Sequence, residues 1–255
     1  MRRLTLAVAA AALIGAGLAS RAARAEDMTA LPEVHWSFDG IFGTFDHAAA
    51  RRGFQVYKEV CSACHSMDLL HYRSIEGLDF SEDEVKAIAA SVQVPGEPDD
   101  NGDVKDRPGK PSDAFKAPFP NTNAARAANN GALPPDLSVI VKARKGGATY
   151  VHAILTGFVN PPADFKLQNG MNYNEYFPGH QIAMPQPLQD SSVTYADGTQ
   201  ATVDQEARDV STFLAWASEP TLEERHFTGV KTILFLIVLT ALLYAYKRKV
   251  WAKVH

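Results

Sequence analysis

The chain has 255 residues, which is enough for one large domain or two small ones. Its composition, with 46% hydrophobic and 21% charged residues, is ordinary for a globular protein, and the sequence shows no internal repeat or low-complexity tract. The formal net charge of −4 argues against a nucleic-acid-binding protein, which needs an excess of Lys and Arg to neutralise phosphates.

The first 25 residues have the pattern of a cleaved secretory signal peptide. Arg2 and Arg3 precede an apolar run over residues 4–18, and Ala23-Arg24-Ala25 forms a small-residue cleavage site. The apolar run is short for a membrane span, which makes an uncleaved anchor the weaker interpretation. We therefore expect an exported mature chain that begins near Glu26.

The segment that follows predicts an irregular, aromatic-rich lead over residues 26–45 and then a helix. Asp46 is a suitable N-cap for this helix, which we expect to run to about Val60. Gly53 and two aromatic residues lie near one face of the helix, an arrangement that favours close packing against a second helix.

The motif Cys61-Ser62-Ala63-Cys64-His65 follows this helix and is typical of c-type haem attachment. Each cysteine can form a thioether with one haem vinyl group, and His65 would be the proximal iron ligand. Cys61 and Cys64 are the only cysteines in the chain. A lone disulfide, a redox dithiol and a zinc site are alternatives, but neither a thioredoxin-like pattern nor a second pair of cysteines accompanies the motif.

Further helices are predicted from capping boxes, N-cap residues and helix-ending glycines. Their ranges are 82–94, 121–131, 134–146, 149–157 and 202–218. Residues 95–121 and 158–200 are predicted to be long loops, with a small hairpin turning at Asp197-Gly198. This pattern predicts a mainly α fold: a cytochrome c-like haem domain with long loops, in which the haem itself supplies a large apolar body for packing.

Residues 227–246 form an apolar segment of about 20 residues, long enough to cross a bilayer as one C-terminal transmembrane helix. Lys231 lies near one end and can reach the interface. The tail that follows is basic, with Lys247, Arg248, Lys249 and Lys253. The positive-inside rule therefore places residues 247–255 in the cytoplasm and the haem domain, residues 26–226, outside it.

The exported domain is strongly acidic. The signal peptide and the tail after Tyr246 each carry a charge of +4, so −12 remains on residues 26–246. Such a field attracts basic partners and speeds their encounter at low salt, although acidity also keeps a domain soluble.

The residues alone leave the sixth ligand of the haem iron open. Met67 is too close to His65 to reach the opposite face of the haem, and Met28 lies in the irregular lead. His180 and His152 are candidates for bis-histidine ligation. Without a second protein ligand the iron would be open for gas binding or catalysis.

Met184 and Met171 are the remaining candidates. Met184 has apolar neighbours and precedes Pro185, which favours an extended backbone suited to a loop across a haem face. Met171 lies among polar residues. The setting favours Met184 and leaves Met171 as the alternative.

Several blocks of the sequence resemble the cytochrome c1 family, the haem subunits of ubiquinol–cytochrome c oxidoreductase (cytochrome bc1) complexes, in their alphaproteobacterial form. The similarity runs from about Arg51 to the C-terminal tail. It is carried by residues 51–57, 61–67, 124–138, 176–179, 183–184, 213–214 and 216–220. The block 124–138 is far more specific than the haem motif.

The resemblance implies that Cys61 and Cys64 carry one covalent haem c, that His65 and Met184 ligate its iron, and that Arg126 pairs with a haem propionate. Some bacterial relatives carry an additional disulfide in this domain, for which this chain has no cysteines.

The resemblance also implies an electron-transfer subunit of the inner membrane that is not an enzyme by itself. It would sit beside cytochrome b in a dimeric respiratory or photosynthetic complex, take single electrons from the Rieske iron–sulfur subunit and pass them to a soluble or tethered cytochrome c. Two alternatives remain at this stage: an anchored c-type haem subunit of another enzyme, such as an oxidase, and an open-site haem sensor or peroxidase.

Overall fold

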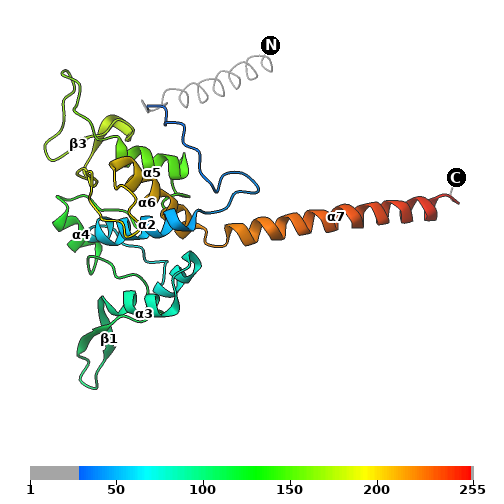
Figure 1. Ribbon diagram of the computed structural model, residues 1–255, viewed down its shortest axis with the longest axis horizontal. Helices are drawn as coiled ribbons and strands as arrows, with labels where there is room; N and C mark the ends of the chain where they lie inside the picture. The colour runs from blue at the N-terminus through cyan, green and yellow to red at the C-terminus, as the bar shows by residue number, and fades with distance from the viewer. Residues whose placement is uncertain (1–28, 254–255) are drawn as a thin grey trace, which may run out of the picture.

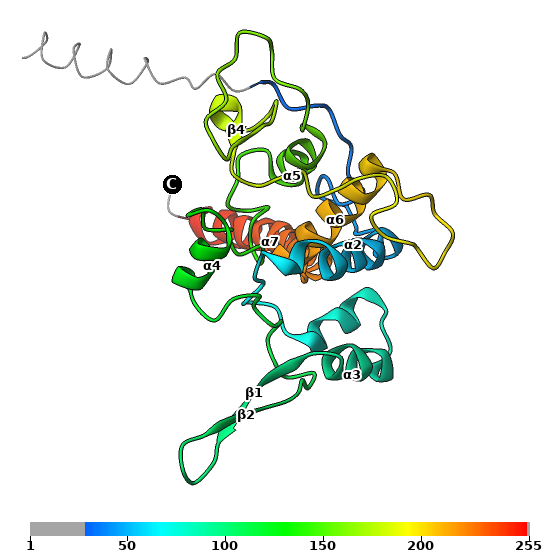
Figure 2. The ribbon, with the colours of Figure 1, turned by 90° about the vertical axis from the view of Figure 1, so that its left-hand side faces the viewer.

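Two helices packed against each other form the centre of the domain. In a computed structural model, which describes residues 29–253, α2 spans His47–Glu59 and α6 spans Val203–Ser218. They lie side by side in both ribbon views (Figures 1 and 2). Both begin at their predicted caps, because the side chains of Asp46 and Thr202 each accept a backbone N–H from the first turn. The predicted signal peptide and Met28 lie outside the described residues.

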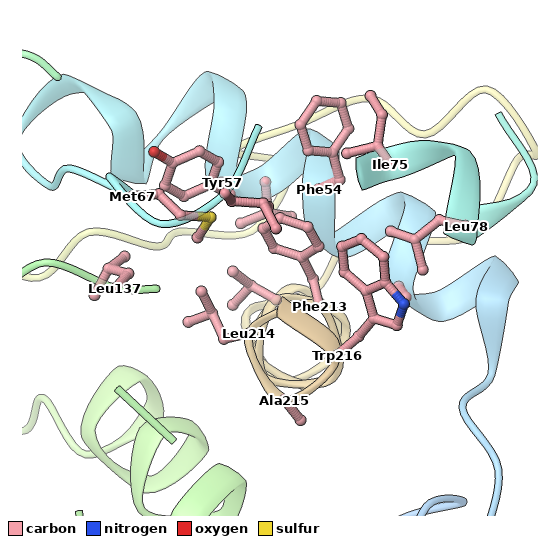
Figure 3. Close-up of a cluster of buried hydrophobic side chains, with 14 of the residues drawn as sticks. Phe54, Tyr57, Met67, Ile75, Leu78, Leu137, Phe213, Leu214, Ala215 and Trp216 are labelled. Carbon is pink, nitrogen blue, oxygen red and sulfur yellow. The ribbon is translucent and has the colours of Figure 1, made fainter. Parts of the chain in front are cut away.

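The hydrophobic core lies along the seam between these two helices. Phe213 of α6 has its ring centroid 5.6 Å from that of Phe54 and 5.8 Å from that of Tyr57, both in α2. Trp216 and Met67 are almost completely buried in the same cluster (Figure 3). Burial of Met67 in the core agrees with its exclusion as a ligand on the far side of a haem.

The remaining elements are short, as a loop-rich, mainly α fold predicts, and this fold class is confirmed. The other helices of the domain are η1 (Cys61–Ala63), η2 (Tyr72–Leu78), α3 (Glu82–Ala90), α4 (Thr122–Ala128), α5 (Gly147–Thr156) and η3 (Pro178–His180). The strands are β1 (Gln93–Pro98), β2 (Val104–Pro108), β3 (Asn172–Tyr173) and β4 (Gln181–Ile182). The capping box at Ser81 is complete, with Glu84 bonding back to the N-cap backbone.

The prediction of a loop throughout residues 95–121 is wrong, because β1 and β2 form an antiparallel hairpin there (Figure 2). The Asp99 carboxylate closes its turn by accepting the backbone N–H groups of Asn101 and Asp103, both at 3.0 Å. Gly102 supplies the positive φ of +85° that the turn needs. The prolines fit because each strand of a two-stranded ribbon has a free edge.

The predicted helix over residues 134–146 is also wrong, since residues 134–137 have no regular structure and residues 138–146 form turns and bends. The backbone N–H of Leu137 donates to the carbonyl of Ser66 (2.9 Å), and that of Ser138 donates to the Asp136 carboxylate (2.8 Å). The acceptor of the Leu137 N–H lies about 70 residues away along the chain, so a contact with a distant segment fixes the backbone here.

Two smaller predictions also need correction. Residues 197–198 do form a turn, with the N–H of Gly198 donating to the carbonyl of Tyr195 (3.3 Å), but no strands flank it. The second capping box is only half formed: Thr202 caps Gln205, whereas the Gln205 amide bonds to Asp209 (3.1 Å).

A single long helix, α7 (Leu222–Trp251), leaves the domain and extends away from it (Figure 1). Among residues 29–253 it is the one helix long and apolar enough to cross a membrane, with a mean hydropathy of 2.0 over its most apolar window and none of that window buried. It contains the predicted span 227–246 and extends beyond it at both ends.

Candidate haem site

The C-terminal end of α2 leads directly into the Cys-Ser-Ala-Cys-His motif. The turn η1 folds the motif tightly, because the N–H groups of Cys64 and His65 both donate to the carbonyl of Cys61, at 3.1 and 2.9 Å. Cys61 and Cys64 are both free thiols. The turn thus presents two thiols and an imidazole from five consecutive residues.

The surroundings of Cys61 disfavour the thiolate form of its side chain. Burial, reinforced by the neighbouring Cys64, raises its pKa to about 12. Redox-active cysteines need the opposite, a thiolate that is stabilised near neutral pH. The direction of this shift disfavours the redox-dithiol alternative.

The ring of His65 is fixed by a backbone carbonyl. Its Nδ1 lies 2.7 Å from the carbonyl oxygen of Pro135, which can only accept, so Nδ1 carries the proton. The Nε2 atom is then left with its lone pair, the arrangement that metal-binding histidines adopt. Burial also lowers the pKa of His65, although the Pro135 carbonyl and the Asp136 charge oppose this, and the neutral ring is the form that binds a metal.

The carboxylate of Asp136 joins the haem motif to the segment around Pro135. It accepts hydrogen bonds from the Ser66 hydroxyl (2.7 Å) and from the backbone N–H groups of Asp68 and Ser138 (both 2.8 Å). Burial alone would raise the pKa of Asp136, but these hydrogen bonds together lower it. The segment that carries Pro135 is therefore held in place against the residues that follow His65.

Met171 and Met184 both lie at one end of the small β3–β4 ladder. Asn172 pairs with Ile182, so Met171 directly precedes the ladder and Met184 follows it. The side-chain amide of Asn172 donates to the backbone carbonyl of Met184 (3.2 Å). Both methionine side chains are half-buried. The ladder thus holds the segment of Met184 while keeping Met171 beside it.

The two histidine candidates have different surroundings. His152 is buried, and its Nε2 is hydrogen-bonded to the Asp204 carboxylate at 2.8 Å, which gives it a role in joining α5 to α6. His180 has a positive φ of +58° and stacks on Tyr173, with ring centroids 5.7 Å apart. His152 is therefore unsuited to ligate iron through Nε2.

Arg126 lies in the last turn of α4 and is exposed. Its guanidinium donates to the carbonyl of Gly131 (2.9 Å), which ties it to the turn that closes the helix. No carboxylate lies within ion-pair distance of it among the described residues, so its charge is available to a negative group of a bound cofactor.

Comparison with known proteins decides the family. The model of the Cytochrome C1 family matches residues 36–254. The chain belongs to the cytochrome c1 family. The cytochrome c1 of Rhodospirillum rubrum is 46% identical over 263 residues, covering 97% of this chain and 96% of that protein. The mitochondrial haem protein cytochrome c1 of Saccharomyces cerevisiae is 50% identical over 235 residues, covering 89% and 76% respectively.

A third relative is named for its assembly. The mitochondrial cytochrome b-c1 complex catalytic subunit of Candida albicans is 51% identical over 223 residues, covering 87% of this chain and 75% of that protein. Membership of the cytochrome c1 family confirms the resemblance drawn from the sequence blocks.

Sequence reasoning missed the contribution of Pro135 and Asp136 to the site. Residues 124–138 carry the family resemblance, yet the local pattern at 134–136 predicts a helix start. The available signal was Asp136, which follows two prolines in this distinctive block. Prolines have no backbone N–H and so cannot donate backbone hydrogen bonds. The structure shows that these residues face the haem motif and orient His65.

Proposed function

We propose that this cytochrome c1 family member is the membrane-anchored haem subunit of a cytochrome bc1 complex. The observation that carries the proposal is the hydrogen bond from His65 Nδ1 to the Pro135 carbonyl, which leaves Nε2 free beside two unpaired thiols. That donor set fits a covalent c-type haem. The names of relatives, which include haem protein and cytochrome b-c1 complex subunit, support the same assignment.

In this proposal the chain binds one haem and closes its iron to other ligands. Cys61 and Cys64 form the thioethers, and His65 and Met184 ligate the iron. Arg126 pairs with a propionate, where the planar guanidinium suits a carboxylate. The bound haem supplies one-electron chemistry, and His/Met ligation raises its potential. The protein holds the ligands and excludes exogenous ones.

The electron route and its partners belong to the same proposal. The haem domain receives single electrons from a Rieske iron–sulfur subunit and passes them to a cytochrome c, within a dimeric complex that also contains cytochrome b. The acidic exported domain would attract a basic cytochrome c, and salt-sensitive docking allows fast release.

The topology follows from the two ends of the chain. Residues 1–25 are a cleaved signal peptide, and residues 26–226 form the haem domain on the periplasmic side of the inner membrane. Residues 227–246 cross the membrane once, and the basic residues 247–255 remain in the cytoplasm. The length and hydropathy of α7 support this arrangement.

The test is purification from native membranes in mild detergent. We expect a reduced-minus-oxidised c-type spectrum, pigment that resists acid-acetone extraction, and co-purification of cytochrome b with ubiquinol-dependent reduction of cytochrome c. Extraction of the pigment would refute covalent attachment. Ready binding of carbon monoxide to the ferrous protein would favour the open-site alternative, and isolation without cytochrome b would favour another respiratory enzyme.

A further inference from the structure

A turn just before α2 exposes two large apolar side chains at its tip. Ile41 is 69% exposed and Phe42 is 78% exposed, the highest value among the large hydrophobic residues that the structure describes. Turn tips are normally formed by Gly, Pro, Asn, Asp and Ser. An adjacent pair of bulky apolar residues at such a place indicates an interaction surface.

The turn is held in a defined conformation. The N–H of Asp39 donates to the carbonyl of Trp36 (3.1 Å), and that of Thr44 donates to the carbonyl of Ser37 (3.0 Å). Gly43 packs so closely on the backbone of Phe38 that a Cβ atom there would overlap its carbonyl. The exposure of the tip is therefore a property of an ordered turn.

The base of the turn is tied to the start of α7. The backbone N–H of Phe45 donates to the carboxylate of Glu223 (2.8 Å), in the first turn of the long apolar helix. Phe45 is itself buried and packs on Phe38, with ring centroids 5.1 Å apart. The segment before α2, dark blue in Figure 1, accordingly extends towards the side of the domain from which α7 leaves.

Chain geometry allows the tip to reach the level at which α7 becomes apolar. From Phe45 to Phe42 an extended chain spans up to about 10 Å. Along α7, the axial rise from Glu223 to Phe227 is only about 6 Å. The ammonium of Lys231 lies 3.9 Å from the centre of the Phe227 ring. A lysine near the end of a membrane-spanning helix keeps its charged head at the interface, so this pair marks the level at which the apolar part of α7 begins.

We propose that Ile41 and Phe42 insert into the interfacial layer of the lipid bilayer and form a second membrane contact beside α7. The proposal rests on the membrane topology proposed above. A single helix leaves a domain free to rotate and tilt about its exit point, whereas a second apolar contact restricts both motions. Binding at the interface strengthens with the apolar area that is buried there, so each inserted side chain adds to the attachment.

Site-specific photo-cross-linking in native membranes tests this placement. A benzoyl-phenylalanine residue replaces Phe42 in one full-length variant, Phe235 near the middle of α7 in a second, and Val104 on β2 in a third. All three native side chains are well exposed, which minimises disturbance of the fold. The membranes contain phospholipid with an alkyne-tagged acyl chain, and cross-linked lipid is measured on the purified chain.

We expect labelling at positions 42 and 235 to exceed labelling at position 104 severalfold. If position 235 labels lipid while position 42 labels only a neighbouring protein or nothing, the interfacial contact is refuted and the membrane span stands. If position 235 does not label lipid, the proposed topology fails and the contact fails with it. Equal labelling at positions 42 and 104 would likewise refute a specific contact.

Discussion

Gly53 in α2 lies directly against the backbone carbonyl of Asp209 in α6, so closely that a Cβ atom on Gly53 would overlap that carbonyl. This contact brings the backbones of the two central helices together and allows Phe54 and Phe213 to meet beside it. The end of α2 positions the haem motif. The distance between these two helices therefore affects the position of the haem motif.

Gly53→Ala should lower the free energy of unfolding by about 1–3 kcal/mol, because the added methyl group forces the helices apart. Denaturant unfolding followed by circular dichroism measures the loss. Gly229→Ala is a matched control, since Gly229 is also helical and a methyl group added there would meet no other segment of the described chain within 4 Å. Equal unfolding midpoints for the two variants would contradict the packing argument.

Asp209→Asn should destabilise the domain by about 1–3 kcal/mol, because Arg52 loses its buried partner and keeps only the partly exposed carboxylate of Asp197, at 3.1 Å. The Arg52 guanidinium binds both oxygens of Asp209 at 2.9 Å, and the two side chains are only 17% and 1% exposed. Hydrogen bonding to Asp209 raises the pKa of Arg52, which stays charged.

The neighbouring residue of α2 supplies the control for this variant. Arg51 pairs with Glu84 at 3.1 Å, and both side chains are about a third or more exposed. Glu84→Gln keeps the capping hydrogen bonds possible and should change stability by less than about 1 kcal/mol. Similar losses in the two variants would contradict the distinction between buried and exposed pairs.

The base of the β1–β2 hairpin should weaken in acid. Hydrogen bonds from Arg107 and from the Lys110 backbone lower the pKa of Asp113 from 3.8 to about 2. Because the folded-state pKa is depressed, the stabilisation is complete above about pH 5 and is lost as the pH falls through 3.8 towards 2.

Asp113→Asn tests this directly and should cost about 1–3 kcal/mol at neutral pH. The difference in free energy of unfolding between the native chain and the variant should shrink as the pH is lowered from about 5 to about 3. Amide exchange in β1 and β2 gives a local readout. A difference that is constant across this range would exclude Asp113 as the titrating group.

Met184→Leu should leave the proposed haem attached, lower its midpoint potential and open the ferrous iron to carbon monoxide, because the thioether ligand is lost. Met171→Leu is the matched control, since Met171 lies at the same end of the β3–β4 ladder. It should change neither property. The reverse pattern would assign Met171 as the ligand, and an unchanged potential in both variants would exclude methionine ligation.

Arg126→Gln should lower the midpoint potential by some tens of millivolts, because a nearby cation favours the ferrous state over the more positive ferric one. For a one-electron couple, about 59 mV corresponds to a factor of ten. Lys105→Gln removes the same charge from the exposed hairpin strand β2 and should leave the potential unchanged. Equal shifts in the two variants would argue against a propionate partner for Arg126.

The sequence by itself determined the features that depend on neighbouring residues. Asp46, Ser81 and Thr202 each cap a helix within three residues, and the apolar residues of α7 follow one another along the chain. The haem motif is likewise one contiguous segment. The residues that form each of these signals are neighbours in the sequence, so the signals can be recognised without the tertiary structure.

Only the tertiary structure decided what Pro135 and Asp136 do. Their oxygen atoms bind His65, Ser66 and Asp68, about 70 residues earlier in the chain, and these contacts replace the helix that the local pattern predicted. The close approach of Phe45 to Glu223 is a contact of the same kind. Hydrogen bonds between distant segments depend on where the fold places each donor and acceptor, so local propensity does not specify them.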